Sequence, residues 1–261
     1  MAARSSTDAV KSRPKSQRKR LDLLLVERGL AESRQRAQGL ILAGQVFVNG
    51  QKQDKAGAQV AIDAGIEITG GQLRYASRGG LKLEGALEEF GISVREKICL
   101  DIGASTGGFT DCLLEHGAQR VYAVDVNVNQ LAWKLQRDTR VVRLERNARE
   151  LHPDDLGEPV ELVAIDVSFI SVTKILRAAV AAAKPGADFL ILVKPQFELD
   201  RGDVGKGGIV SDPRLHERAV ERVKASAAEA GLAIVGARPS RLPGAEGNQE
   251  FFLHARREAV E

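Results

Sequence analysis

Residues 98–125 read ICLDIGASTGGFTDCLLEHGAQRVYAVD and carry the clearest indication of fold class, because they combine a strand, a turn, a helix and a second strand. An apolar run leads into a glycine-rich turn, and a second apolar run ends at Asp125. Doubly wound α/β sheets bind ligands at such turns, where the carboxyl ends of the strands lie. The stretch therefore predicts a cofactor-binding strand-helix-strand unit.

The chain from residue 97 onward repeats this alternation of apolar runs and helical segments. We expect helices at 81–90 and 214–230 beside a Rossmann-like α/β sheet of seven strands. The expected strands are Ile98–Ile102, Val121–Val126, Val141–Leu144, Leu162–Ile165, Phe189–Val193, Leu232–Val235 and Phe251–Leu253.

The glycine-rich turn favours S-adenosylmethionine over a dinucleotide. The middle glycine of a dinucleotide fingerprint is replaced by Ser105, and Asp101 precedes the first glycine. A carboxylate there repels a pyrophosphate but helps to hold the ammonium of a methionine group. Asp125 is placed to bind a ribose diol. The turn resembles motif I of class I methyltransferases, and the predicted cofactor residues are Asp101, Gly103, Ser105, Thr106, Gly107, Gly108, Phe109, Asp125, Asn147 and Ala148.

A smaller module precedes this domain. Apolar residues from Leu21 at helical spacing predict a first helix, which Gly29 ends, and Ser33 caps a second predicted helix at 34–43. The run 46–50 ends in Asn-Gly, a strong hairpin signal. Glycines and broken periodicity at 70–80 indicate a linker.

The module, RLDLLLVERGLAESRQRAQGLILAGQVFVNG at 20–50, resembles the S4 RNA-binding domain, a small α+β fold. Basic residues in the first turn of its second helix lie where backbone N–H groups also favour phosphate. The resemblance and the basic cluster together predict RNA binding by Arg20, Arg34, Arg36, Lys52 and Lys55.

Four ionisable residues lie at the sheet positions where this fold exposes side chains to its cleft. Lys82 precedes the first strand, Asp166 and Lys194 end the fourth and fifth, and Glu250 opens the seventh. The order matches the catalytic tetrad of RrmJ/FtsJ-like 2'-O-methyltransferases. We expect Lys194 to act on the ribose hydroxyl as base or charge stabiliser, Asp166 to orient it, and Lys82 and Glu250 to position the ribose.

Other methyl acceptors fit this sequence less well. Amino-group methyltransferases carry two prolines after the fourth strand, whereas residues 166–169 read Asp-Val-Ser-Phe. Cytosine C5 methylation requires a loop cysteine, whereas Cys99 lies in the first strand and Cys112 on the next helix. Neither cysteine has metal-ligand spacing, and no metal is expected.

Both domains together resemble the TlyA, or haemolysin A, family over residues 20–256. The resemblance rests on SRGGLKLEGAL, DIGASTGGFTDCLL, DVSFISV and LVKPQFE followed by VGKGGIV. It implies methylation of cytidine 2'-hydroxyls in 16S or 23S ribosomal RNA, on ribosomes or their subunits. It also implies a linker that matters for cofactor binding, although the family's Arg-x-Trp-Val is Arg-Tyr-Ala-Ser at 74–77 here.

Composition sets the remaining expectations. The 261 residues are 43% hydrophobic and suffice for one large and one small domain. Seven basic residues and Asp8 give residues 1–20 a charge of +6, so the remainder carries −3 of the net +3. We expect a disordered basic arm at 1–19, an S4-like domain at 20–70, a linker at 71–80 and a methyltransferase domain at 81–261.

Two alternatives belong to other functional classes. The haemolysin name suggests a membrane-lysing protein, but no secretory signal or apolar span is found in the sequence. A cytoplasmic protein is therefore expected, and no membrane partner. The second alternative is a ribosome-assembly factor that binds RNA without catalysis, against which the intact tetrad argues. The sequence leaves the oligomeric state open.

Overall fold

The computed structural model describes residues 18–31, 33–68, 74–244 and 247–258. The chain divides into two compact units, Met1–Gln72 and Leu73–Glu261. Residues 1–17 of the predicted basic arm and residues 71–73 of the predicted linker lie outside the described residues.

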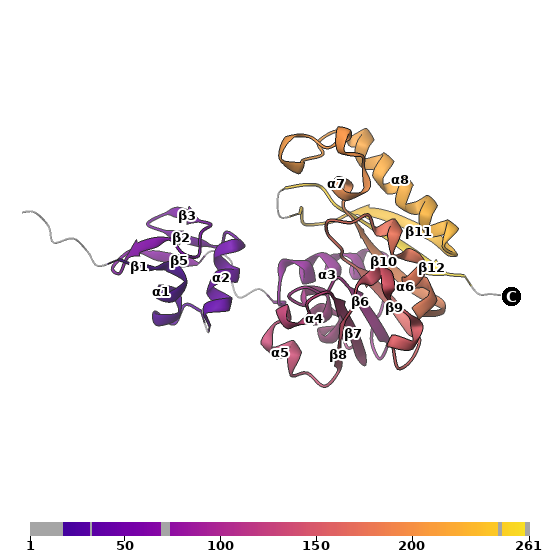
Figure 1. Cartoon of the computed structure of the whole chain (residues 1–261), viewed down its shortest axis with the longest axis horizontal. Helices are drawn as coiled ribbons and strands as arrows, with labels where there is room; N and C mark the ends of the chain where they lie inside the picture. Colours follow the sequence, from indigo (N-terminus) through magenta and orange to yellow (C-terminus); the bar gives the residue numbers. More distant parts are fainter. Residues whose placement is uncertain (1–17, 32, 69–73, 245–246, 259–261) are drawn as a thin grey trace, which may run out of the picture. The chain divides into compact units, whose positions relative to one another are not determined.

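The N-terminal unit packs two helices against short strands (Figure 1). The helices α1 and α2 and the hairpin that joins β2 to β3 confirm the pattern read from the sequence. At the hairpin turn, Asn49 and Gly50 have φ angles of 50° and 77°, the left-handed backbone that this turn requires. The elements are β1 (Arg18–Arg20), α1 (Leu21–Glu27), α2 (Arg34–Leu42), β2 (Val46–Val48), β3 (Gln51–Gln53), β4 (Gln59–Ala61) and β5 (Ile66–Ile68).

The core of this unit is small. Leu21, Leu25 and Ile41 are fully buried between the helices and Val46 of the sheet. The strands pair in the order β3-β2-β5, with β1 and β4 forming a separate antiparallel ladder. The sequence pattern did not predict β1, β4 or β5, because each has only three residues, too few for a readable alternation, and none has the Asn-Gly signal that marked β2 and β3.

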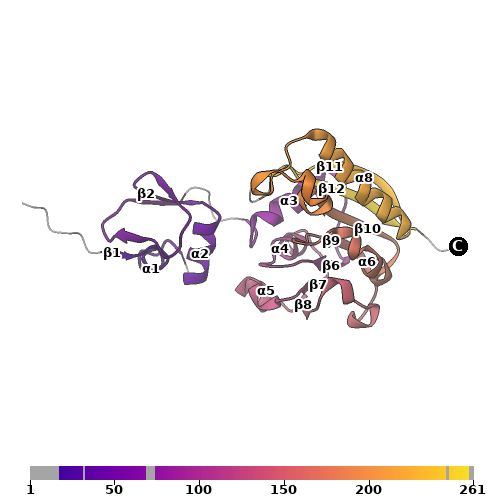
Figure 2. The ribbon, with the colours of Figure 1, turned by 45° about the horizontal axis from the view of Figure 1, so that its top comes forward.

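The C-terminal unit is a seven-stranded sheet with helices on both faces, which confirms the expected fold class (Figures 1 and 2). Its strand order is β11-β12-β10-β9-β6-β7-β8, and β12 is antiparallel to both neighbours. The strands are β6 (Ile98–Ile102), β7 (Arg120–Asp125), β8 (Val141–Glu145), β9 (Val160–Ile165), β10 (Ala183–Val193), β11 (Leu232–Pro239) and β12 (Phe251–Arg257). The α-helices are α3 (Arg78–Phe90), α4 (Gly108–Glu115), α5 (Trp133–Gln136), α6 (Leu176–Ala182), α7 (Pro195–Glu198) and α8 (Pro213–Glu229).

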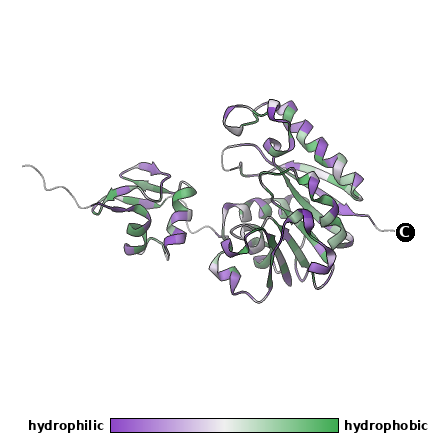
Figure 3. Ribbon diagram, viewed as in Figure 1, coloured by the Kyte–Doolittle hydropathy of each residue, from purple (hydrophilic) through white to green (hydrophobic). Residues whose placement is uncertain are grey.

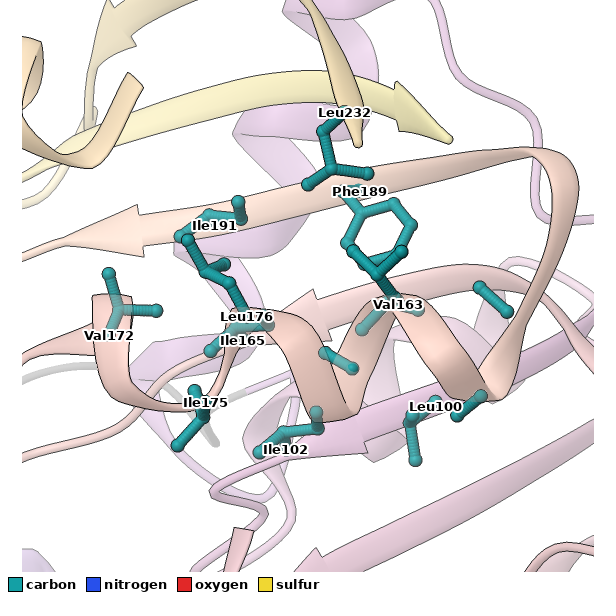
Figure 4. Packing of buried hydrophobic residues seen from close by; sticks show 14 of the residues in the cluster. Leu100, Ile102, Val163, Ile165, Val172, Ile175, Leu176, Phe189, Ile191 and Leu232 are labelled. Atoms are coloured by element: carbon teal, nitrogen blue, oxygen red, sulfur yellow. The ribbon is translucent and has the colours of Figure 1, made fainter. Parts of the chain in front are cut away.

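Two apolar clusters hold the layers together, one on each face of the sheet. Helices α3 and α4 cover the face that carries Val121 and Leu190. Helices α6 and α8 cover the other face, where Phe189 and Ile191 pack beside Val163 and Leu176 (Figure 4). The strands are accordingly apolar on both faces of the sheet, while the outward-facing positions of the helices are hydrophilic (Figure 3). Such burial on both faces explains why the strands read as continuous apolar runs.

Helix α3 begins at Arg78, three residues before the predicted start, because the Ser77 side chain accepts a hydrogen bond from Gly79 N. The preceding residues, assigned by their sequence to the linker, pack onto this unit. Tyr75 is 1% exposed and its hydroxyl donates to Glu84 over 2.8 Å, while Ala76 N donates to the Asp111 carboxylate over 2.7 Å. An aromatic side chain thus anchors a segment that its glycine content had marked as irregular.

Candidate cofactor and active site

The turn after β6 forms because two strand ends approach closely. Gly103 has a φ of 89°, and a Cβ atom on it would lie 2.3 Å from the Asp166 carbonyl oxygen at the end of β9. Only glycine fits both constraints. The turn therefore brings the ends of β6 and β9 into contact at the carboxyl edge of the sheet.

A cavity of about 530 Å³ opens beside this turn, within the roughly 300–1,000 Å³ typical of ligand sites. Asp125 lies in its wall and accepts hydrogen bonds from Ser105 N at 2.9 Å and Asn127 N at 3.1 Å. A carboxylate fixed in this way retains lone pairs for a diol. Five of the predicted cofactor residues line the cavity, namely Gly103, Ser105, Asp125, Asn147 and Ala148.

Asp101 lies behind the turn and is fully buried. Thr110 Oγ1 donates to its Oδ2 over 2.6 Å, and among the described residues its Oδ1 has no hydrogen-bond partner. Burial raises the pKa of this carboxyl to about 7, although the Thr110 hydrogen bond opposes the rise. An unsatisfied buried oxygen fits the ammonium that the sequence predicts there.

The other predicted cofactor residues lie at the start of α4 and outside the cavity wall. The Phe109 side chain is 3% exposed and stacks on Phe252, with ring centroids 6.1 Å apart. Gly107 has a φ of 92° and lies against Leu135, while Gly108 lies against Ser77. Gly107, Gly108 and Phe109 are therefore buried in the core, whereas Thr106 is exposed.

The four residues of the predicted tetrad form two ion pairs. Lys82 Nζ lies 2.5 Å from Glu250 Oε2, and Lys194 Nζ lies 2.5 Å from Asp166 Oδ1. Lys194 also donates to Ser168 Oγ over 2.8 Å. The side chains of both lysines are only 11% exposed.

Strand register brings the two pairs to the same edge. Val193 and Phe251 are partners in the antiparallel β10–β12 ladder, so Lys194 and Glu250 continue this ladder as neighbours. Asp166 follows β9, the parallel neighbour of β10. The register thus brings Lys194, Asp166 and Glu250 to one edge of the sheet, with Lys82 paired to Glu250. Of the four, Asp166 adjoins the turn that holds Gly103 and lines the cavity.

The sequence pattern missed residues that shape the cavity mouth. Phe169 has a φ of 67° and is 89% exposed, in a left-handed conformation that is rare for an aromatic residue. It lines both the main cavity and a neighbouring one of about 300 Å³. The sequence shows that Phe169 lies three residues beyond Asp166. It does not show the positive φ, because no residue pattern predicts that conformation for a bulky side chain.

Glu198 fixes this segment to α7. Its buried carboxylate accepts hydrogen bonds from Ser171 Oγ at 2.5 Å and Val172 N at 2.8 Å. Burial raises the pKa of Glu198, although both hydrogen bonds oppose the rise. The loop that carries Phe169 is therefore held to the short helix that follows Lys194.

The predicted RNA-binding residues occupy the surface of the N-terminal unit. Lys52 and Lys55 are exposed and Arg36 is half-buried, and the Lys52 side chain lies over Gly44. Arg20 and Arg34 instead both contact one buried carboxylate, that of Asp22.

Within the described ranges, no helix is long and apolar enough to cross a membrane. The same ranges contain no group of three or more His, Cys, Asp or Glu side chains arranged to hold a metal ion. Cys99 and Cys112 are both buried free thiols.

Comparison with known proteins agrees with this two-unit architecture. Residues 75–257 match the FtsJ-like methyltransferase family and residues 19–65 match the S4 domain. A Mycobacterium tuberculosis protein named 16S/23S rRNA (cytidine-2'-O)-methyltransferase TlyA is 49% identical over 92% of this chain and 91% of its own. Hemolysin A of Brachyspira hyodysenteriae is 46% identical over 90% of this chain and 98% of its own.

Solved structures give the same result for the fold. A Streptococcus thermophilus protein assigned as a hemolysin has a TM-score of 0.74 and 42% identity, covering 94% of this chain and 90% of its own. An S-adenosylmethionine-dependent methyltransferase from Mesorhizobium loti has a TM-score of 0.54 at 17% identity, covering 69% of this chain and all of its own. The second likeness concerns the fold alone.

Proposed function

The chain belongs to the TlyA family of FtsJ-like methyltransferases, and we propose that it transfers a methyl group from S-adenosylmethionine to the 2'-hydroxyl of cytidine in ribosomal RNA. The observation that carries the proposal is the pairing of Lys194 with Asp166 beside the cofactor turn and of Lys82 with Glu250 at the same edge of the sheet. The names of the relatives support the choice of cytidine and of 16S or 23S RNA.

S-adenosylmethionine, when bound, supplies an electrophilic methyl group on a sulfonium. The cavity residues on the turn and after β7 would hold it, with Asp125 at the ribose and Asn147 and Ala148 at the adenine. The free Oδ1 of Asp101 would accept the ammonium.

Lys194 acts on the acceptor hydroxyl in this proposal. Its Nζ is held between Asp166 Oδ1 and Ser168 Oγ, so its position is fixed before substrate arrives. A ribose hydroxyl is a weak nucleophile, and a positioned group that removes its proton or stabilises the forming alkoxide accelerates transfer. The hydrogen bond between Lys82 and Glu250 holds each side chain in one rotamer. Two side chains fixed in this way would position the ribose.

The S4 unit supplies affinity for structured RNA, and the ribosome or one of its subunits is the proposed partner. Exposed basic residues on this unit neutralise phosphates without reading sequence. Choice of the modified nucleotide then rests with the C-terminal unit, hereafter the catalytic unit, where Phe169 offers an exposed aromatic face at the cavity mouth.

The test is transfer of labelled methyl to free ribosomal RNA, small subunits and large subunits, with the modified sugar mapped by its resistance to alkaline hydrolysis. Lys194→Ala should lower the rate about 10²- to 10⁴-fold and leave S-adenosylmethionine affinity within a few-fold. Lys184→Ala is the matched control, because that lysine is exposed at the opposite end of β10. No incorporation into any RNA by the wild type would support the binding-only alternative, and full activity of Lys194→Ala would remove the proposed role of that lysine.

A further inference from the structure

The most unusual polar group of the N-terminal unit is the carboxylate of Asp22, which is fully buried. Among the described residues, five donors surround it. Arg20 Nε and Leu23 N donate to Oδ1 over 3.0 Å each. Arg20 Nη2 and Arg34 Nε donate to Oδ2 over 2.9 Å each, and Gln38 Nε2 over 3.1 Å. The hydrogen bonds from Arg20, together with those from Arg34 and Gln38, hold the pKa of Asp22 well below its usual range despite burial.

A purely structural explanation accounts poorly for this arrangement. Asp22 joins α1 to α2, but an apolar pair would join two helices at no desolvation cost, and buried ion pairs are weak sources of stability. The two arginines keep large exposed fractions, 40% for the Arg20 side chain and 54% for Arg34. The acid is thus hidden while the cations that it binds face solvent.

The shared oxygen places two guanidinium groups side by side. Two like charges at such a separation repel each other, and the carboxylate between them offsets that repulsion. The N–H groups that Asp22 leaves unused have no acceptor among the described residues. The group as a whole carries one net positive charge and several fixed, outward donors, which is the chemistry that recognises a phosphate.

We infer that Asp22 is a positioning residue for RNA binding: it holds Arg20 and Arg34, both predicted above to bind RNA, in the geometry that one backbone phosphate requires. The inference rests on the proposed function, since it requires that the S4 unit bind RNA. It assigns a positive role in RNA affinity to an acidic side chain.

The direction in which one substitution changes RNA affinity distinguishes this role from a general electrostatic effect. Removing a negative charge from an RNA-binding surface should strengthen binding, because the protein then attracts phosphate more strongly. Asp22→Asn should instead weaken it, since the amide accepts fewer hydrogen bonds and releases the arginines. One phosphate contact contributes about 0.9 to the slope of log K against log salt, which corresponds to about eightfold in affinity at 0.1 M salt relative to 1 M. Loss of the contact therefore weakens binding about eightfold at 0.1 M salt and makes the slope shallower by about 0.9.

The experiment measures binding of the full chain to a fluorescein-labelled RNA hairpin of about 30 nucleotides, from 50 to 300 mM KCl. Asp22→Asn should bind about eightfold more weakly at 0.1 M salt, with the shallower slope. Asp54→Asn, the same exchange at an exposed acid of this unit, should bind as tightly as wild type or more so. Arg34→Lys keeps the charge but lacks the guanidinium geometry and should also bind more weakly.

A folding control is built into the same series. Val46→Ala removes methyl groups from a fully buried position of this unit and destabilises it without touching the arginines. Hydrogen exchange over residues 20–68 compares the unit's stability in both variants. Equal RNA loss in Val46→Ala and Asp22→Asn at matched protection would show that Asp22 acts through folding alone and would overturn the inference.

Two outcomes distinguish this inference from the proposed function. Unchanged or tighter binding by Asp22→Asn, in a preparation whose wild type methylates RNA, overturns the phosphate site alone. Weaker binding by Asp22→Asn, with a wild type that methylates no RNA, upholds the phosphate site and overturns the enzyme assignment.

Discussion

Replacing Asp101 by asparagine tests how one buried carboxylate affects the stability of this protein and its affinity for S-adenosylmethionine. Burial raises its pKa to about 7, above the ordinary value of about 3.9 in the unfolded chain. The folded protein therefore binds one more proton than the unfolded chain between these two pH values. Its stability falls as pH rises through this window and levels off above pH 7.

The size of the effect follows from the width of the window. One pKa unit corresponds to 1.36 kcal/mol, so ionisation of Asp101 costs up to about 4 kcal/mol, of which about 2 kcal/mol falls between pH 5.5 and 7. Asparagine has no charge and removes this dependence. The free energy of unfolding of Asp101→Asn, relative to wild type, should therefore rise by about 2 kcal/mol across that interval.

Trp133 makes the measurement direct. It is the single tryptophan of the chain and lies on α5 of the catalytic unit, so urea titrations followed by its fluorescence report on that unit. Thr110→Val is the matched variant, because it removes the 2.6 Å hydrogen bond that favours the ionised form and should move the pH midpoint upward. Parallel pH profiles for wild type and Asp101→Asn would show that ionisation of Asp101 does not affect the stability of the unit in this range.

The same substitution tests cofactor binding. An ammonium pairs with the ionised carboxylate, so the affinity of the wild type for S-adenosylmethionine should rise up to tenfold per pH unit below pH 7. Calorimetric titration of Asp101→Asn should show weaker and pH-independent binding over pH 5.5–7. A pH-independent wild type would show that Asp101 does not contact the ammonium.

Two further predictions concern the cavity mouth and the opposite end of the sheet. Phe169→Ala should lower kcat/KM for RNA about tenfold to a hundredfold, the range expected for loss of one stacked base, with S-adenosylmethionine affinity unchanged by calorimetry. Asp188→Asn should cost the catalytic unit about 3–5 kcal/mol in urea titrations, because Asp188 is a buried partner of Lys97, His254 and Arg256. Burial opposes ionisation of Asp188, but hydrogen bonds from these partners outweigh it and hold its pKa below the usual range. Its contribution should therefore be complete above about pH 4 and decline in more acidic solution, and a wild type with no such decline would contradict this account.

Much of the catalytic fold was predictable because its strands are buried on both faces. All seven apolar runs became strands, although β10 and β12 extend well beyond the predicted ends. The extra residues of β12 include His254 and Arg256, polar side chains that the sheet accepts because they pair with Asp188. Ion pairs between β10 and β12 therefore stabilise strand residues that the local apolar pattern did not predict.

The candidate site was predictable in its residues and less so in its contacts. The order Lys82, Asp166, Lys194 and Glu250 indicated convergence, but the division into two pairs depends on strand register. The role of Asp22 had no sequence signal, since an acid beside Arg20 reads as a solvated surface charge. Its burial arises only when α2 packs against α1.

The antiparallel course of β12 has a consequence for the timing of synthesis. Glu250 precedes the last strand, yet its partner Lys82 lies on the first helix of the catalytic unit, 168 residues earlier. A growing chain emerging from the ribosome therefore has the methyl-donor turn long before it has a complete acceptor site. We expect catalytic competence to arise only after the final strand has inserted between β10 and β11, so that translation of this segment times the onset of activity.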